Sequence, residues 1–163
     1  MTHIPRISIE KELTAAPGLG PWGGAGGRPF EDGVFSGIRK ISVYRDDYVV
    51  HSIVIEYDRS GKSILKKHGG DGGDIVNEVY FDYPIECLIS ISGFYGVFDG
   101  HEVVKSLSFY TNDGSYGPFG NEAGLFFSSR EVDAIIVGFH GRSGLYLDAI
   151  GVVREYFKCT IPK

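Results

Sequence analysis

Near the C-terminal end, an aspartate follows a glycine at a distance of four residues, in the segment Gly144-Leu145-Tyr146-Leu147-Asp148. A carboxylate has two oxygens that accept several hydrogen bonds, which suits two neighbouring hydroxyl groups of a sugar. Backbone N–H groups of a glycine-containing turn can add directional donors. Two interpretations stay open: Asp148 binds a ligand, or it caps its own turn, as aspartate often does. Tyr146 likewise could cover the apolar face of a sugar or pack against a neighbouring strand.

Four other segments resemble functional motifs, but each lacks the spacing or the neighbouring residues that its chemistry requires. Residues 18–23 have the glycine spacing of a dinucleotide fingerprint, but the glycine- and proline-rich residues after them cannot begin the helix that this motif requires. The segment that starts at His101 lacks the last histidine of a zinc-binding HExxH motif. Residues 69–74 carry two carboxylates without the ligand spacing of a calcium loop. Ser143 lacks the spacing of a nucleophile elbow. We therefore expect no enzyme activity, no metal and no cofactor.

The segments that must position these residues have the pattern of β-strands. Apolar and polar residues alternate over short runs, and no window of about a dozen residues shows a helical period. Glycine, asparagine, aspartate and serine cluster between the runs, as in tight turns. The alternating runs include residues 41–43, 53–57, 79–81 and 107–109, and the turn clusters include 58–61, 69–73, 112–114 and 141–144. The pattern predicts an all-β fold.

A weak internal repeat organises these strands. Residues 50–55, 104–109 and 147–152 share one order of residue types: aliphatic, polar, small, aliphatic, any, apolar. At the second position of the three copies stand His51, Lys105 and Asp148, so three similar loops would carry different side chains. A unit of about 45 residues holds roughly four strands with their turns. The repeat predicts about a dozen strands in a closed, pseudo-threefold arrangement, which would also leave few exposed sheet edges.

Length, composition and charge limit the class of protein. The 163 residues favour one domain, and we expect it over residues 18–160, after an N-terminal arm over residues 1–17. The formal net charge of −5 removes the attraction that draws proteins to nucleic acids and anionic membranes, so neither partner is expected. The longest uncharged stretch is rich in glycine and proline and shorter than the roughly 18 apolar residues of a membrane-spanning helix.

The N-terminus and the cysteines bear on the compartment. The first residues lack the uninterrupted apolar run of a secretory signal, so we expect a cytoplasmic or nucleocytoplasmic protein. The chain has two cysteines, Cys87 and Cys159, which form no CxxC motif. They are too few for a disulfide scaffold, and reduced thiols agree better than a disulfide with a cytoplasmic location.

Three blocks of the sequence resemble the jacalin-related lectins. They are residues 20–27 (GPWGGAGG), 116–120 (YGPFG) and 137–152 (VGFHGRSGLYLDAIGV), and the likeness extends in order over about residues 18–157. The resemblance implies a β-prism of three Greek-key, four-stranded sheets with pseudo-threefold symmetry. It also implies binding of carbohydrate without metal or catalysis.

The resemblance further implies a sugar site between the glycine-rich N-terminal loop and the GxxxD loop. Gly27, Leu145 and Tyr146 would donate backbone N–H groups, Gly144 would open the second loop, and Asp148 would accept from two sugar hydroxyls. Galactose-binding members of the family are cut in the N-terminal loop, whereas Gly27 lies inside a continuous chain, so mannose- or glucose-containing glycans are the expected partners.

Two further expectations follow from the family. Some members carry a second site in the first repeat, but His51 replaces the expected acid there, and only Asp46 or Asp47 could partly compensate. Family members also assemble, so a homo-oligomer, either a dimer or a tetramer, is expected. The alternative function is a protein-interaction module that keeps the lectin scaffold but has weak or lost sugar binding, an alternative motivated by His51 and Lys105.

Overall fold

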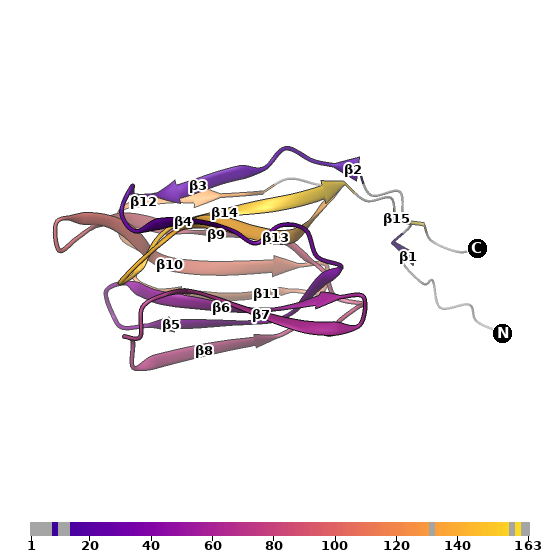
Figure 1. The fold of residues 1–163 in the computed structure, drawn as a ribbon, viewed down its shortest axis with the longest axis horizontal. Coiled ribbons are helices and arrows are strands. Elements are labelled where there is room, and N and C mark those ends of the chain that lie inside the picture. Colours follow the sequence, from indigo (N-terminus) through magenta and orange to yellow (C-terminus); the bar gives the residue numbers. More distant parts are fainter. Residues whose placement is uncertain (1–7, 10–13, 131–132, 157–158, 161–163) are drawn as a thin grey trace.

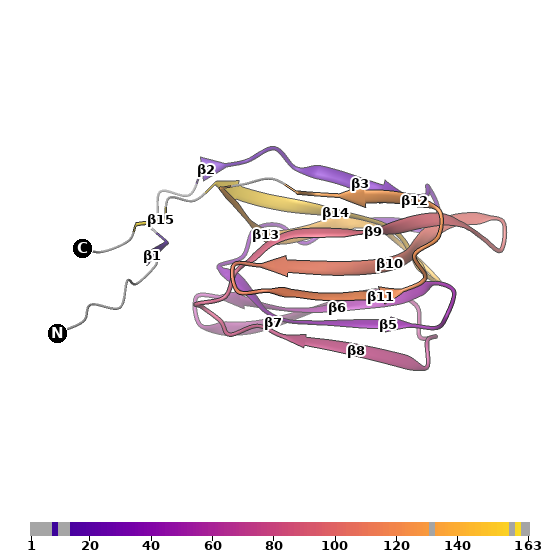
Figure 2. The same ribbon diagram turned by 180° about the vertical axis from the view of Figure 1, so that it is seen from behind.

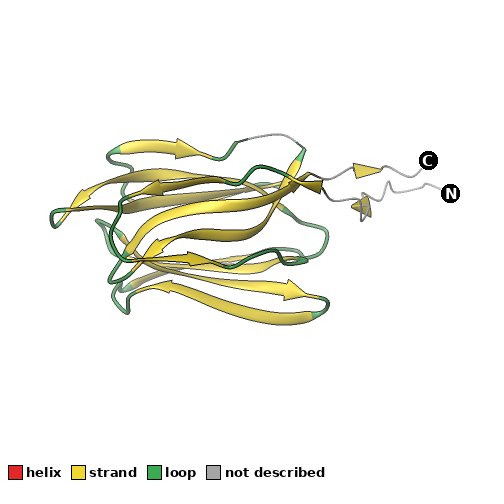
Figure 3. Cartoon of the chain, turned by 45° about the horizontal axis from the view of Figure 1, so that its top comes forward, coloured by secondary structure: helices red, strands yellow, loops and turns green. Residues whose placement is uncertain are grey.

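The fold consists of three antiparallel β-sheets around one core (Figure 1). The computed structural model describes residues 8–9, 14–130, 133–156 and 159–160, and these contain strands and loops but no helix (Figure 3). The all-β expectation is therefore confirmed. In the first sheet the spatial order is β7 (Lys62–Gly69), β6 (Val50–Arg59), β5 (Gly37–Arg45) and β8 (Ile75–Tyr80). In the second, which faces the viewer in Figure 2, the order is β11 (Ser115–Gly120), β10 (His101–Thr111), β9 (Leu88–Phe98) and β12 (Leu125–Ser128).

The third sheet combines the two ends of the chain. Its C-terminal strands β13 (Ala134–Ser143) and β14 (Leu147–Tyr156) pair with β4 (Arg28–Glu31) on one side and with β3 (Leu19–Gly23) and β2 (Thr14–Ala15) on the other. In each sheet the strand that comes fourth in the unit lies beside the first, which is Greek-key topology. The predicted β-prism of three Greek-key sheets is confirmed, with β2 as an additional short strand on the edge of β14.

The core is built by the repeated apolar positions. The three repeat segments form the central strands β6, β10 and β14, and their aliphatic and aromatic positions lie fully inside the prism. These positions are Val50, Ile53 and Ile55 in the first copy, Val104, Leu107 and Phe109 in the second, and Leu147, Ile150 and Val152 in the third, all 0% exposed. Burial of each such side chain contributes about 1.5–3 kcal/mol relative to exposure. The alternation that marks these segments in the sequence is therefore the packing of the core.

The predicted N-terminal arm meets the third sheet at its end. Thr14 and Ala15 pair with Tyr156 and Glu155, and the buried guanidinium of Arg154 donates to the carbonyl of Pro17 at 2.8 and 3.2 Å. Further along the arm, β1 (Ser8–Ile9) pairs with β15 (Cys159–Thr160). Residues 1–7 and 10–13 of the arm lie outside the described residues, and the division at residue 17 stays a prediction.

A buried polar cluster joins the first sheet to the third. Asp32, just after β4, accepts from the hydroxyl of Tyr57 at 2.7 Å and lies 2.8 Å from Nε2 of His68. The ring of Phe30 stacks on His68, with centroids 3.6 Å apart. Burial, with the Asp32 charge, raises the pKa of Tyr57, so its hydroxyl stays protonated and donates. The cluster satisfies polar groups that the prism encloses between two sheets.

Candidate functional site

Three pairs of loops have the same geometry at one end of the prism. In each repeat, the first residue after an outer strand donates its N–H to the carbonyl of the residue at the second position of the repeat; the outer strands are β3, β7 and β11. The three pairs are Gly24 with Asp148 at 2.9 Å, Gly70 with His51 at 3.1 Å and Asn121 with Lys105 at 3.0 Å. The alignment of Asp148 with His51 and Lys105 in the sequence therefore reflects equivalent places in the structure.

Asp148, the second residue of β14, is enclosed by the glycine-rich loop that follows β3. Its side chain is 6% exposed and faces two glycines. A Cβ atom added to Gly26 would lie 2.7 Å from Oδ1 of Asp148, and one added to Gly27 would lie 2.6 Å from Oδ2. Gly27 also has a φ of +63°, a conformation that glycine adopts without strain. The glycines are needed here because any side chain would occupy the space in front of the carboxylate.

The carboxylate of Asp148 has unused acceptor capacity. Within the part of the chain that the structure describes, it accepts no hydrogen bond from another residue. Burial raises the pKa of Asp148, and the nearby His101 and Arg142 oppose that effect. A buried carboxylate with no donor beyond its own backbone N–H is energetically unfavourable, and a ligand that supplies hydroxyl donors would relieve this cost.

Arg142 fixes the glycine-rich loop against β13. Its Nε donates to the carbonyl of Gly26 at 2.9 Å, and its second nitrogen donates to the carbonyl of Gly27 at 3.1 Å. These bonds hold both carbonyls, and with them the peptide planes that face Asp148. Arg142 is not among the site residues expected from the sequence, although it stands directly before the Ser143–Gly144 turn.

The GxxxD loop forms the outer wall. The N–H of Gly144 donates to the carbonyl of Tyr146 at 3.0 Å, which closes a tight turn. Gly144 lies against Gly27, since a Cβ on Gly144 would be 3.3 Å from the Cα of Gly27. Leu145 is 69% exposed and Tyr146 half-buried. The backbone N–H groups of Gly27, Leu145 and Tyr146 donate to no backbone carbonyl among the described residues.

The structure thus brings the five predicted site residues to one place. Gly27, Gly144, Leu145, Tyr146 and Asp148 surround a buried carboxylate with backbone groups on two sides. Their arrangement can bind adjacent hydroxyl groups of a polyol, and it offers no nucleophile aligned with a base. The assignment of these residues to sugar binding stays a prediction.

An aromatic row connects this site to the other two repeats. The ring of Tyr146 meets His51 and Phe98 edge-on, with centroids 5.3 and 5.7 Å apart, and Phe98 stacks with Tyr48 at 6.2 Å. Tyr48 is 62% exposed. These contacts agree with the packing interpretation of Tyr146, and its contact with a sugar stays a prediction. No sequence signal singles out Phe98, which lies at the tip of the second unit.

The corresponding loop of the first repeat closes on itself. His51 Nε2 lies 2.7 Å from Oδ2 of Asp46, and Oδ1 of Asp46 accepts the N–H groups of Tyr48 and Val49. Burial acts to raise the pKa of Asp46, but these hydrogen bonds outweigh it and lower the pKa. Both carboxylate oxygens are thus engaged inside the loop, in contrast to those of Asp148. Asp47 keeps an exposed position beside it.

Neither a metal centre nor a membrane helix is seen in the described ranges. No group of three or more histidine, cysteine, aspartate or glutamate side chains there could hold a metal ion. No helix in these ranges is long and apolar enough to cross a membrane. Cys87 is partly exposed, and the side chain of Cys159 lies outside the description, so the state of the two thiols stays a prediction.

Comparison with known proteins decides the family. The jacalin-like lectin domain family matches residues 19–153. The chain belongs to the jacalin-like lectin family. Jacalin-related lectin 19 of Arabidopsis thaliana is 42% identical over 145 residues, which cover 87% of this chain and 81% of that protein. The artocarpin–mannotriose complex superposes with a TM-score of 0.80 at 36% identity and covers 86% of this chain and 98% of artocarpin.

Longer lectins also match. Jacalin-related lectin 3 of Arabidopsis thaliana is 49% identical over 154 residues, and an agglutinin of Castanea crenata is 44% identical over 155 residues. These cover 91% and 92% of this chain but 26% and 50% of the two relatives. The chain therefore spans about a quarter and a half of their lengths. The part of the sequence that matches is a jacalin-like lectin domain in each case.

Proposed function

We propose that this lectin binds mannose- or glucose-type glycans through one site in its third repeat. Asp148 accepts from two adjacent sugar hydroxyls, and the N–H groups of Gly27, Leu145 and Tyr146 donate to sugar oxygens. The observation that carries the proposal is the buried carboxylate of Asp148, which has no donor from another described residue and faces the bare backbone of Gly26 and Gly27. Hydroxyl donors from a sugar would supply the bonds that the protein leaves unmade.

The preference for mannose and glucose over galactose rests on the continuous loop. The nitrogen of Gly27 lies in a peptide bond, so it carries no positive charge at the site. Relatives support the same choice: the mannose/glucose-specific lectin of Parkia platycephala is 46% identical over 137 residues. The galactose-specific lectin of Morus indica is 38% identical over 138 residues, so both specificities occur among relatives and a direct test is required.

Retention on immobilised sugars tests this proposal. The purified protein should be retained on a mannose matrix, eluted by free methyl α-mannoside and not eluted by methyl α-galactoside at the same concentration. Asp148→Asn, which keeps the size of the side chain and removes its charge, should pass through the column. Retention of the Asp148→Asn variant equal to that of the unmodified protein would refute the assignment of Asp148.

A single shallow site binds a monosaccharide weakly, on the order of millimolar or about 4 kcal/mol. Useful avidity therefore needs several sites on one particle, which favours a dimer or a tetramer. Light scattering coupled to gel filtration would give the mass of the assembly, and a monomer at micromolar concentration would contradict this part of the proposal.

A protein-interaction module is the second candidate. It is favoured by the loop of the first repeat, where His51 and Asp46 bind each other, and by Lys105 in the second repeat. Protein partners that stay bound in excess methyl α-mannoside would support this candidate, and partners released by the sugar would support the lectin proposal.

A further inference from the structure

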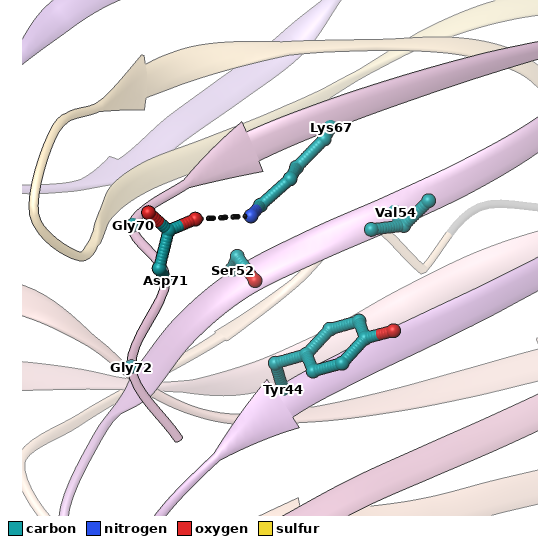
Figure 4. Close-up of a pocket in the computed structure, with 7 residues that line it drawn as sticks. All are labelled: Tyr44, Ser52, Val54, Lys67, Gly70, Asp71 and Gly72. Atoms are coloured by element: carbon teal, nitrogen blue, oxygen red, sulfur yellow. Dashed lines mark hydrogen bonds and ion pairs between the residues drawn. The ribbon is translucent and has the colours of Figure 1, made fainter. Parts of the chain in front are cut away.

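A pocket lies on the outer face of the first sheet, beside the glycine-rich loop of residues 69–73. Its volume is about 180 Å³. It is smaller than the roughly 300 Å³ at which pockets for drug-sized ligands begin. The lining residues come from β5, β6, β7 and the loop (Figure 4): Tyr44, Ser52, Val54, Lys67, Gly70, Asp71 and Gly72.

The walls of this pocket, here called the outer pocket, have distinct chemistry. Lys67 and Asp71 form one side and are joined by an ion pair of 2.8 Å. Tyr44 lies on the opposite side, and Ser52 lies between them (Figure 4). Ser52 is 1% exposed, and neither its hydroxyl nor that of Tyr44 has a hydrogen-bond partner among the described residues. The outer pocket therefore presents two unused hydroxyl groups beside an aromatic ring.

In the other two repeats a different side chain stands at the position of Tyr44. Arg142 pairs with Ala149 as Tyr44 pairs with Ser52, and the Arg142 side chain is tied to the carbonyls of Gly26 and Gly27. In the second repeat Phe94 takes this position and packs edge-on against Phe126, with centroids 5.4 Å apart. The fold therefore does not require Tyr44 or the ion pair of Lys67 and Asp71 at this position of the repeat.

We propose that the outer pocket binds one neutral sugar ring of pyranose type. The ion pair of Lys67 and Asp71 cancels the charge of the pocket, which favours a neutral ligand, while both groups can still bond to hydroxyls. Tyr44 offers a ring face for the apolar face of a sugar, and Ser52 offers a hydroxyl beneath it. The volume fits a single ring.

The outer pocket is separate from the site at Asp148. The two share no residue, so this inference does not rest on the proposed function. They are neighbours, however, because Gly70 at the rim of the outer pocket lies against the carbonyl of Leu145. The length of a glycan would decide whether one glycan molecule can occupy the outer pocket and the Asp148 site at the same time.

Amide-resolved NMR titration tests the inference. The protein carrying Asp148→Asn is titrated separately with methyl α-mannoside, methyl α-glucoside and methyl α-galactoside, and with glycerol at equal concentration as a polyol without a ring. At least one pyranoside should shift the amides of Ser52, Gly70 and Gly72 saturably, whereas glycerol should not. In unmodified protein, shifts at Gly27 and Tyr146 report the Asp148 site independently.

Two variants then assign the response to the outer pocket. Asp71 is fully exposed, so Asp71→Ala should leave the fold intact and weaken the pyranoside at the outer pocket about tenfold, through loss of hydrogen bonds to a charged group. Tyr44→Ala should abolish the shifts. The inference is overturned if no pyranoside shifts these amides, if glycerol shifts them equally, or if both variants respond like the parent.

Discussion

Gly26 and Asp148 lie so close that a single additional carbon on the glycine would stand 2.7 Å from Oδ1 of the carboxylate. The contact joins the N-terminal glycine-rich loop to the second residue of β14, across more than a hundred residues of sequence. Gly26 has an ordinary backbone conformation, since its φ is not among the positive ones. The requirement for glycine at this position is therefore steric and is located at the proposed sugar site.

Gly26→Ala separates binding from folding. The added methyl group should push into the space of the sugar and displace the Asp148 carboxylate, so affinity for methyl α-mannoside should fall at least about tenfold, the equivalent of about 1.4 kcal/mol. The melting temperature should change little. Gly114→Ala is the matched control, because a Cβ there meets nothing within 4 Å and its φ is not positive. Unchanged sugar affinity in Gly26→Ala would contradict the proposed position of the ligand.

Acidification should release the sugar. Burial raises the pKa of Asp148 from the ordinary value of 3.8, and the sugar needs the charged form, so protons and sugar compete. Affinity for methyl α-mannoside should be constant near pH 7 and fall as the pH drops through a midpoint above 3.8. Calorimetric titrations over a pH series measure this midpoint, with near-ultraviolet circular dichroism as the control for folding. A midpoint below 3.8 would be inconsistent with Asp148 as the acceptor.

The raised pKa of Asp148 affects folding in the opposite direction from sugar binding: acidification weakens sugar binding but increases this group's contribution to the stability of the fold. Because the folded-state pKa of Asp148 is raised, the folded protein binds this proton more tightly than the unfolded chain. This group's contribution to the free energy of unfolding therefore decreases as the pH rises from 3.8 through the folded-state pKa. Asp148→Asn should be at least as stable as the unmodified protein at pH 7, as measured by urea unfolding. A marked loss of stability would mean that Asp148 has a structural role.

The buried cluster of Asp32, Tyr57 and His68 should be important for stability. Asp32→Ala removes the acceptor of two buried donors, and we expect a loss of about 2–4 kcal/mol in the free energy of unfolding. Tyr57→Phe removes one hydrogen bond and should cost about 1–2 kcal/mol. Asp71→Ala, at a fully exposed ion pair, should leave the value almost unchanged. Equal effects of Asp32→Ala and Asp71→Ala in urea unfolding would contradict this ranking.

Much of the fold can be predicted from the sequence because burial follows a period of two. Val50, Val104 and Leu147 occupy the same position in three copies, and the structure places all three in the core. The repeat also draws attention to Asp148, because it is the only carboxylate at the second position of the three copies, where the other two carry His51 and Lys105. Repeats are local patterns, and local patterns are visible in a single chain.

Contacts between distant segments are not visible in this way. Arg142 reaches Gly26 and Gly27 over more than a hundred residues, and only the closed third sheet brings them together. The row from Tyr146 to Phe98 and Tyr48 joins three repeats through side-chain packing at one end of the prism. His51 and Asp46 are only five residues apart in the sequence, but their contact depends on the turn geometry around Val49.

Calorimetric titration with methyl α-mannoside tests the central claim most directly. Methyl α-galactoside serves as the comparison sugar, and Asp148→Asn is paired with Asp113→Asn, which alters an exposed carboxylate in the turn after β10. We predict saturable mannoside binding in the millimolar range, weaker or absent galactoside binding, loss of the mannoside signal in Asp148→Asn and no change in Asp113→Asn. Full mannoside affinity in Asp148→Asn, or a preference for galactoside in the unmodified protein, would contradict the account.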